Sequence, residues 1–296
     1  MIIITTPTGL IGHQVLDNVL EGGDEPVRVI VRDPANLPSH VRECVEVVEG
    51  SHGDQGVVER AFDGADSVFW LVPPDPHAES VEAAYVDFSR PAAEAIASLG
   101  VGRVVSVSGL GRGTAVADNA GYVTGSLAMD DLIAGTGVNF RALTMPSFMD
   151  NVIRQVGPIK NQGMFFSPIS GDRKLPAVAT RDIAAVAANL LLDHSWTGRD
   201  HVAVLGPENL SFDDMARIMS EVLGTLVRFQ QIPGEAYKET MMGVGMSDAM
   251  AQGMLDMALA KDKGLDNAEP RTPRATTPTS FRQWCEEVLK PAVQAA

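Results

Sequence analysis

Short apolar runs alternate with helical stretches along the first half of the chain, and this alternation constrains the fold more than any other feature. The stretches between the runs carry an apolar residue every three or four positions, and several end at a glycine, which commonly stops a helix. The runs are rich in Val and Ile, as strands buried on both faces should be: 2–5, 27–31, 45–48, 67–72 and 104–107. Strand–helix alternation predicts an α/β fold with a doubly wound parallel sheet and right-handed crossovers.

The second half continues this pattern and then changes it. A helix over about 122–134 precedes a sixth strand at 139–146, and two further strand–helix pairs follow. In these pairs Asp182 and Ser211 stand at helix starts, where their side chains can cap the helix. The last third is a methionine-rich helical region, which predicts a smaller α/β lobe over the carboxyl ends of the sheet. The expected division is a sheet domain over 1–155, completed by 175–206, and a C-terminal lobe over 207–296, with 156–174 contributing.

Charge and composition argue against several classes of protein. The net charge of −15 disfavours binding to nucleic acid or to an anionic membrane. Cys44 and Cys285 form no close-spaced pair and the six histidines are scattered, so we expect neither a disulfide framework nor a metal site. Neither a signal peptide nor a bilayer-spanning run is recognisable, and the expected location is the cytoplasm.

The segment "TPTGLIG", residues 6–12, joins the first strand to the first helix. A glycine here lets the backbone approach a pyrophosphate, another lets the helix pack close to the strand, and the helix N-terminus adds partial positive charge. Gly9 and Gly12 fill those two roles, while Thr6 holds the place of a third glycine. The segment predicts a dinucleotide-binding loop, and a purely structural turn is the alternative.

Arg32 stands twenty residues beyond Gly12, at the end of the second strand. An acid at this place binds the ribose 2′-hydroxyl of NAD, whereas an arginine holds the 2′-phosphate of NADP. Arg32 therefore favours NADP. The alternative is that Arg32 is a solvated charge paired with its neighbour Asp33.

Eight segments in a fixed order carry a family resemblance over almost the whole chain. They are "TPTGLIG", "VRDP", "FDGADSVFWLVPP", "VGRVVSVSGLG", "MPSFMDN", "ATRDIAAVAANLL", "LGPENLSFDDMARIMSEVLG" and "PTSFRQW". With them the chain resembles the NmrA-like branch of the atypical short-chain dehydrogenases, similar to bacterial quinone and triphenylmethane-dye reductases. The resemblance implies a Rossmann domain with a substrate-binding C-terminal lobe, NADP(H) as cofactor, and either reductase activity or redox sensing without catalysis.

The resemblance also assigns site residues. Ser51 and His52 follow Gly50 where the family often has Gly-Asp, so the adenine side departs from the family pattern. The residues assigned to NADP(H) are Thr6, Thr8, Gly9, Leu10, Ile11, Gly12, Arg32, Ser51, Leu71, Val72, Pro73, Pro146 and Phe148. The residues predicted for the substrate are Pro74 and Phe148, at positions that match the family, and Phe165, Met242 and Met246, which are chosen for their aromatic or methionine side chains.

The catalytic residues of short-chain dehydrogenases are only partly present. These enzymes use a tyrosine with a lysine four residues on and a serine after the fifth strand. Ser108 and Tyr122 stand at the serine and tyrosine places, but Ser126 replaces the lysine. Tyr122 could instead pack against a neighbouring helix, and Ser108 could bond the backbone at the strand end. Lys160 could reach the site from the lobe.

Methionines recur every four residues near the C-terminus, at 242, 246, 250 and 254, with another at 257. On one helix they would form a flexible stripe, either an adaptable wall for a flat substrate or part of the lobe core. Gly243, Gly245 and Gly253 interrupt the region and suggest bends or a moving lid. Aromatic walls could come from Trp70, Phe148, Phe165 and Phe166.

Three functions remain open on the sequence. The first is an NADP-dependent oxidoreductase acting on a small aromatic, quinone-like or enone substrate. The second is a non-catalytic NADP-binding redox sensor that acts through a protein partner. The third is a non-redox tailoring enzyme on the same scaffold. A small-molecule substrate is expected, nucleic acid and membrane are not, and a homodimer is left open.

Overall fold

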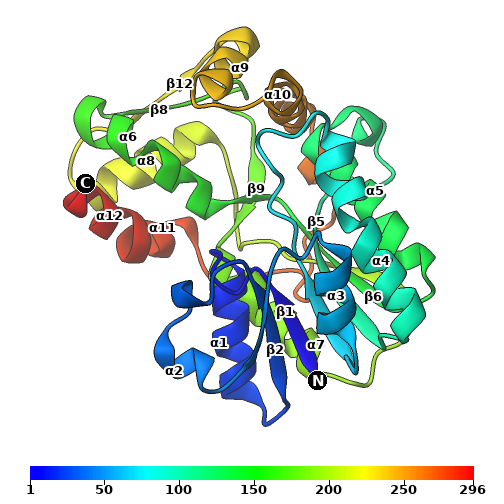
Figure 1. The fold of residues 1–296 in the computed structure, drawn as a ribbon. Helices are drawn as coiled ribbons and strands as arrows, with labels where there is room; N and C mark the ends of the chain where they lie inside the picture. Colours follow the sequence, from blue (N-terminus) through cyan, green and yellow to red (C-terminus); the bar gives the residue numbers. More distant parts are fainter.

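The computed structural model describes residues 1–296 and has a seven-stranded parallel sheet at its centre (Figure 1). The strand order is β10-β6-β5-β4-β1-β2-β3, so the predicted doubly wound sheet is confirmed. The order reverses between β1 and β4, and ligands of such folds bind outside the carboxyl ends of the strands at this point. The strands are β1 Ile2–Thr5, β2 Val27–Val31, β3 Glu46–Glu49, β4 Ser67–Trp70, β5 Arg103–Gly109, β6 Asn139–Met145 and β10 Arg199–Ala203.

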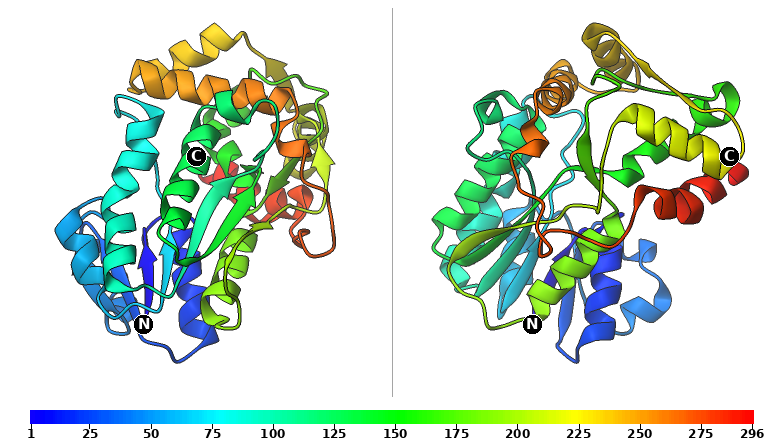
Figure 2. Two further views of the ribbon diagram at one scale, coloured as in Figure 1. Left: turned by 90° about the vertical axis from the view of Figure 1, so that its right-hand side faces the viewer. Right: turned by 180° about the vertical axis from the view of Figure 1, so that it is seen from behind.

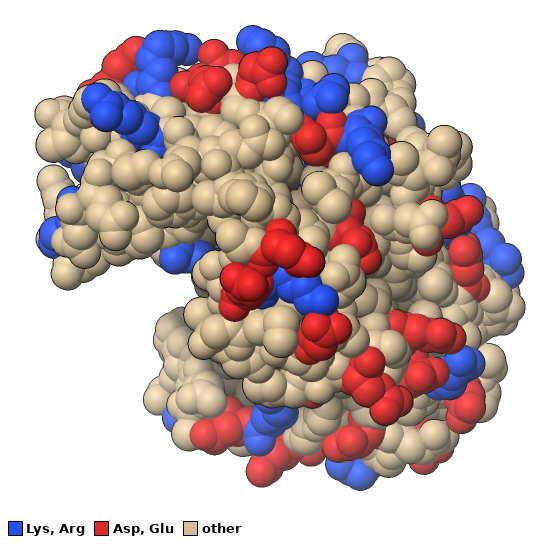
Figure 3. All heavy atoms as spheres, turned by 90° about the horizontal axis from the view of Figure 1, so that it is seen from above, with Lys and Arg blue, Asp and Glu red and all other residues tan.

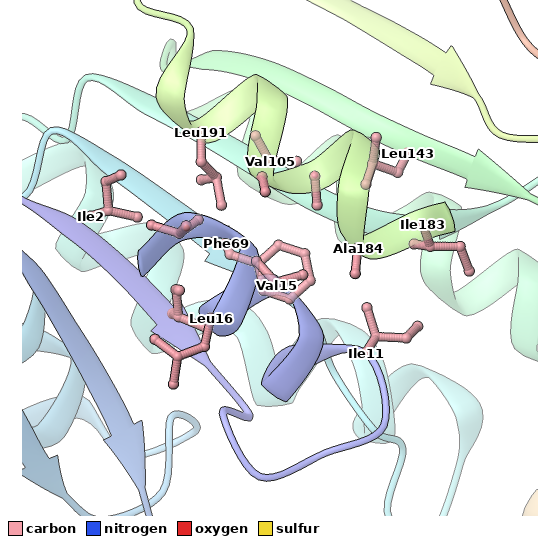
Figure 4. Close-up of a cluster of buried hydrophobic side chains, with 14 of the residues drawn as sticks. Ile2, Ile11, Val15, Leu16, Phe69, Val105, Leu143, Ile183, Ala184 and Leu191 are labelled. Carbon is pink, nitrogen blue, oxygen red and sulfur yellow. The ribbon is translucent and has the colours of Figure 1, made fainter. Parts of the chain in front are cut away.

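Helices cover both faces of this sheet. On one face α1 (Gly12–Gly22) packs against α7 (Thr180–Leu192), and their apolar sides meet Phe69 and neighbouring strand residues (Figure 4). On the other face lie α3 (Gln55–Phe62), α4 (Phe88–Leu99) and α5 (Tyr122–Gly135). The Val and Ile side chains of the strands are buried on both sides, which explains why the runs are apolar without alternation. Short elements between these are η1 Pro34–Asn36, α2 Ser39–Arg42, η2 Ala83–Asp87 and η3 Ala117–Asn119.

A second lobe lies over the carboxyl ends of the strands (Figures 1 and 2). It holds two small sheets, ordered β11-β9-β7 and β12-β8, and a core of its own that includes Phe281 and Trp284. Its elements are β7 Ser147–Phe148, η4 Met149–Gln155, α6 Val156–Gln162, β8 Met164–Ser167, β9 Leu175–Val178, β11 Asn209–Leu210, α8 Phe212–Leu223, β12 Arg228–Gln231, α9 Gly234–Gly243, α10 Asp248–Asp262, η5 Leu265–Asn267, α11 Phe281–Trp284, η6 Cys285–Leu289 and α12 Lys290–Ala295. None of the helices has the length and apolar character that crossing a bilayer requires.

The two predicted helix caps have different outcomes. Ser211 does cap α8, because its side chain accepts from the Asp214 N–H at 3.1 Å and Asp214 bonds back to Ser211 N–H. The prediction for Asp182 was wrong. Its buried carboxylate accepts from the backbone N–H and the hydroxyl of Thr279 at 3.0 and 2.8 Å. Asp182 thus ties the start of α7 to the segment before α11.

This tie gives the first testable prediction. Thr279→Val keeps the side-chain shape and removes the hydroxyl that donates to Asp182. We expect the free energy of unfolding to fall by about 2 kcal/mol, because the buried Asp182 carboxylate loses one of its donors and the Nε of Arg181 loses its acceptor. Urea denaturation measures the change. Thr276→Val is the control, since Thr276 is only half-buried and its hydroxyl bonds only the Thr272 carbonyl. Equal losses in the two variants would contradict the prediction.

Candidate active site

The loop between β1 and α1 is closed by the backbone of Thr6. Thr6 has a φ of +53°, and it is the one non-glycine residue with a left-handed backbone. Its carbonyl accepts from the Gly9 N–H at 2.9 Å. A Cβ at Gly12 would lie 2.0 Å from the same carbonyl oxygen, whereas one at Gly9 would lie 3.3 Å away. Gly12 is therefore the glycine that the close approach of helix and loop requires.

The loop also leaves backbone donors unused. No side chain caps α1, and the N–H groups of Leu10, Ile11 and Gly12 have no acceptor in the protein. The Leu10 side chain is 55% exposed, so this end of the helix faces outward. Free N–H groups at the positive end of a helix dipole form a site for an anion. The loop therefore fits the pyrophosphate of a dinucleotide.

Thr6 carries strain that a glycine would not. A β-branched residue in the left-handed region is disfavoured by about 1–2 kcal/mol, and the buried Thr6 hydroxyl has no hydrogen-bond partner. Thr6→Gly relieves both costs, while glycine adds about 0.5–1 kcal/mol of chain entropy. We expect the variant to gain about 1 kcal/mol in the free energy of unfolding, measured by urea denaturation. A loss of stability would show that the Thr6 side chain makes a contribution which these two costs do not capture.

Arg32 lies at the end of β2 without a partner. The structure gives it neither a hydrogen bond nor an ion pair, and its side chain is exposed. The alternative pairing with Asp33 was wrong, because the Asp33 carboxylate accepts from the Ala35 N–H at 2.9 Å and caps η1. A free guanidinium beside the dinucleotide loop fits the 2′-phosphate of NADP, to which it can offer two parallel N–H donors.

His52 lies beside two predicted cofactor residues, Leu71 and Arg32, although the sequence assigned it no role. Its ring lies between Trp70 and Phe88, with centroid distances of 5.2 and 4.8 Å. Burial lowers the pKa of His52 to about 4, against the raising effect of its bond to Leu71, and the nearby Arg32 lowers it further. His52 is therefore neutral at physiological pH, and Nε2 donates to the Leu71 carbonyl at 3.1 Å. The preceding Ser51, where the family often has aspartate, accepts from the Gly53 N–H.

Tyr122 is enclosed by α10. The side chain is 8% exposed, and Met250 and the backbone of Gly253 pack against it. Burial raises the pKa of Tyr122 to about 12; Tyr237 raises it further and Arg154 lowers it. The hydroxyl is therefore a weaker acid than an exposed tyrosine. This position favours the packing role over the catalytic one.

Neither Ser126 nor Lys160 takes the place of the missing lysine beside Tyr122. The Ser126 hydroxyl donates to the Val123 carbonyl within α5 at 2.9 Å. Lys160 is exposed on α6, where it forms no ion pair. Ser108 is buried on β5, and its hydroxyl bonds neither the backbone, as one interpretation expected, nor a side chain in good geometry.

Two of the predicted aromatic walls lie elsewhere. Phe165 is 1% exposed and packs with Phe212 and Phe229 in the lobe core, so it has no free face for a substrate. Trp70 is fully buried under α3 and α4. Phe148 remains half-buried at the start of the lobe. Of the other residues predicted near the cofactor and substrate, Val72 and Pro146 are buried, Leu71 and Pro74 are half-buried, and Pro73 is exposed.

The methionine stripe is split between two helices. α9 ends at Gly243, Gly245 has a φ of +101°, and α10 begins at Asp248. The predicted bend is therefore confirmed at Gly243 and Gly245, but the prediction was wrong at Gly253, which lies within α10. Met242 is 43% exposed and Met246 lies in the bend, whereas the methionines of α10 pack toward the molecule. Seen from above, the outline of the molecule is hollowed at the left of Figure 3.

Known proteins that are similar to this chain carry the names of reductases or oxidoreductases. A (4-alkanoyl-5-oxo-2,5-dihydrofuran-3-yl)methyl phosphate reductase of Streptomyces griseus is 29% identical, over 97% of each chain. An NAD(P)H azoreductase of Xenophilus azovorans is 28% identical, over 93% of each chain. The structure of an NADPH-dependent quinone oxidoreductase of Escherichia coli, solved with NADPH, has a TM-score of 0.81 and 20% identity, covering 98% of this chain and all of that one.

Family profiles identify the chain itself. An NAD(P)H-binding family profile matches residues 7–194, and the NmrA-like family profile matches residues 134–285. The first match includes the loop from Thr8 to Gly12 and Arg32, and the second includes most of the C-terminal lobe. Each covers more than half of the chain, and the chain therefore belongs to the NmrA-like family of NAD(P)H-binding proteins.

Proposed function

We propose that this chain is an NADPH-dependent reductase of small conjugated acceptors, with quinone-like, azo or enone groups. The observation that carries the proposal is the pair of unused donor sets, the loop N–H groups of residues 10–12 and the guanidinium of Arg32. Together they match the pyrophosphate and the 2′-phosphate of NADPH. The named activities of the Streptomyces, Xenophilus and Escherichia relatives support the class of substrate.

A conjugated acceptor suits the residues that this chain offers. When bound, NADPH supplies a hydride. The chain holds the cofactor at the carboxyl edge of the sheet, and the lobe above that edge encloses the substrate and excludes water. Tyr122 is a weak acid without a lysine beside it, which suits an acceptor whose charge is delocalised over a ring better than an isolated ketone. We place this reaction in the cytoplasm, on a freely diffusing substrate.

Turnover tests the proposal directly. The purified protein is mixed with NADPH and a panel of quinones, azo dyes and enones, and absorbance follows the loss of NADPH. Oxidation of NADPH with matching product formation supports the reductase. Binding of NADPH without turnover of any acceptor favours a redox sensor, which the high pKa of Tyr122 and the absent lysine would also suit. Product formation without loss of NADPH would instead indicate a non-redox enzyme.

The cofactor preference gives a separate prediction. Arg32→Ala removes the cation that faces the 2′-phosphate, and we expect the affinity for NADPH to fall about 30-fold, as loss of a charge-assisted bond of about 2 kcal/mol requires. The affinity for NADH, which lacks that phosphate, should change little. Calorimetric titration measures both. Arg90→Ala, an exposed arginine on α4, is the control for net charge. Equal losses for NADPH and NADH would contradict the assignment.

A further inference from the structure

A buried polar cluster lies between the sheet and α5, in a core that is otherwise apolar. Asp130 on α5 is 2% exposed, and its Oδ1 accepts from the Ser106 hydroxyl at 2.6 Å. Ser108 follows on the same face of β5, because residues two apart on a strand point the same way. Thr144 on β6 stands beside Ser108 in the parallel register. All four side chains are buried.

Three atoms of this cluster have no hydrogen-bond partner: the hydroxyls of Ser108 and Thr144, and Oδ2 of Asp130. Buried polar atoms are nearly always paired, because an unpaired one loses its bonds to water without replacement. A carboxyl with a free oxygen inside a core, next to a free hydroxyl, is therefore a costly arrangement. Groups of this kind gather at functional sites.

The cluster points to the site along β5. Ser108 is the last residue but one of β5, whose carboxyl end lies at the edge where ligands of this fold bind. Tyr122, Ser126 and Asp130 are spaced by four residues, and so they share one side of α5. Tyr122 is enclosed and the Ser126 hydroxyl is already used within the helix. Asp130 is thus the remaining acid on that side of α5.

We propose that Asp130 stores the proton for the reduction and delivers it through the hydroxyl of Ser108. The proposal rests on the reductase function proposed above. As hydride reaches the conjugated acceptor, the acceptor oxygen or nitrogen takes the Ser108 proton, and Ser108 takes the proton of Asp130 Oδ2. The substrate gains one hydride and one proton, and Asp130 is left as a carboxylate that solvent reprotonates. Asp130 acts through Ser108 and does not touch the substrate.

The environment of Asp130 suits this role. Burial raises the pKa of Asp130 to about 6, against the lowering effect of Ser106 and Ser108. Of the charged side chains around it, Arg112 lowers the pKa and Asp131 on the same helix raises it. The carboxyl is thus protonated in a pH range where an exposed aspartate is not. The kcat/KM for the acceptor should therefore be highest below about pH 6 and should fall as the pH rises above 6.

The test is the pH profile of kcat/KM for the acceptor that the wild type reduces fastest, at saturating NADPH. We expect Ser108→Ala to lower kcat/KM about 100-fold, which is the effect of removing a positioned proton donor. Ser108→Thr keeps a hydroxyl and should restore most of the wild-type kcat/KM. Asp130→Asn should abolish the fall of kcat/KM above about pH 6. Ser106→Ala should shift that fall to higher pH, because the Ser106 bond stabilises the carboxylate. Calorimetric titration with NADPH shows whether each variant still folds and binds.

Infrared spectroscopy follows the carboxyl group itself, independently of activity. The protonated Asp130 should give a carbonyl band that disappears near pH 6 and is absent from Asp130→Asn. If the wild type oxidises no NADPH with any acceptor, the proposed function fails and this proposal fails with it. If the wild type is active and its pH profile is unchanged in Asp130→Asn, the proton route alone is wrong. Equal rate losses in Ser106→Ala and Ser108→Ala would also overturn it.

Discussion

Gly12→Ala should cost the protein both its fold stability and its cofactor. The added Cβ would lie 2.0 Å from the Thr6 carbonyl oxygen and 2.7 Å from its carbonyl carbon, and neither atom can move without displacing β1. We expect the free energy of unfolding to fall by about 3 kcal/mol or more, at the upper end for overpacking. The loop N–H groups would shift as well. The affinity for NADPH should therefore fall at least about 100-fold, equivalent to about 2.7 kcal/mol.

Two glycines serve as controls for this variant. Gly56→Ala lies at the exposed start of α3, where the new Cβ meets only the end of the Arg60 side chain at 3.6 Å. The free energy of unfolding of Gly56→Ala should rise by about 0.5–1 kcal/mol, and its affinity for NADPH should not change. Gly9→Ala should have a stability and an NADPH affinity between those of Gly12→Ala and Gly56→Ala, since its Cβ would lie 3.3 Å from the Thr6 carbonyl oxygen. Urea denaturation and calorimetric titration measure the three variants. Wild-type binding by Gly12→Ala would exclude this loop as the pyrophosphate site.

The sheet and the loop were predictable because their causes are local. Apolar runs such as 2–5 and 27–31 are continuous because both faces of the sheet are covered, and that condition leaves a direct mark on the sequence. Gly12 was predictable for a similar reason, since only glycine allows the helix so near the preceding strand. The cap at Ser211 depends on Asp214, only three residues away.

The errors arise where a residue meets one that is distant in the sequence. Asp182 looked like a cap because its neighbours are helical, yet its partner Thr279 is 97 residues away. The glycines among the methionines suggested bends, but the sequence could not show that the backbone turns at Gly245 and stays helical at Gly253. Phe165 could not be assigned to a core or a pocket until Phe212 and Phe229 were placed beside it.

The candidate site shows the same division. Arg32 was found by its distance along the chain from the loop. That it forms no ion pair with Asp33 could not be predicted, because the Asp33 carboxylate caps η1 instead. His52 was noted only as a departure from Gly-Asp, because its neighbours Trp70 and Phe88 come from other elements. Asp130 stands in an apolar helix, and that is a signal in the sequence. Its significance appears only when Ser106 and Ser108 are brought against it.

The burial of Asp130 should make the stability of the protein depend on pH in an unusual direction. The folded-state pKa is about 6, above the ordinary value of 3.8, so the folded protein holds this proton more tightly than the unfolded chain does. The contribution to stability is therefore fully present below about pH 4 and is lost as the pH rises through about 6. At about 1.4 kcal/mol for each pH unit between the two values, the loss amounts to about 3 kcal/mol.

Asp130→Asn isolates this effect from the other titrating groups. Asparagine keeps the shape and cannot ionise, so its stability relative to the wild type should improve by about 3 kcal/mol between pH 4 and pH 7.5. Urea denaturation at several pH values measures the difference. Ala128→Asn is the control on the same helix: Ala128 is exposed and the substitution changes no titrating group, so its difference from the wild type should vary little with pH. A constant difference for Asp130→Asn as well would mean that the carboxyl of Asp130 ionises as easily inside the protein as in water. The core around Ser106 and Ser108 would then have to be open to solvent, contrary to their burial in the structure.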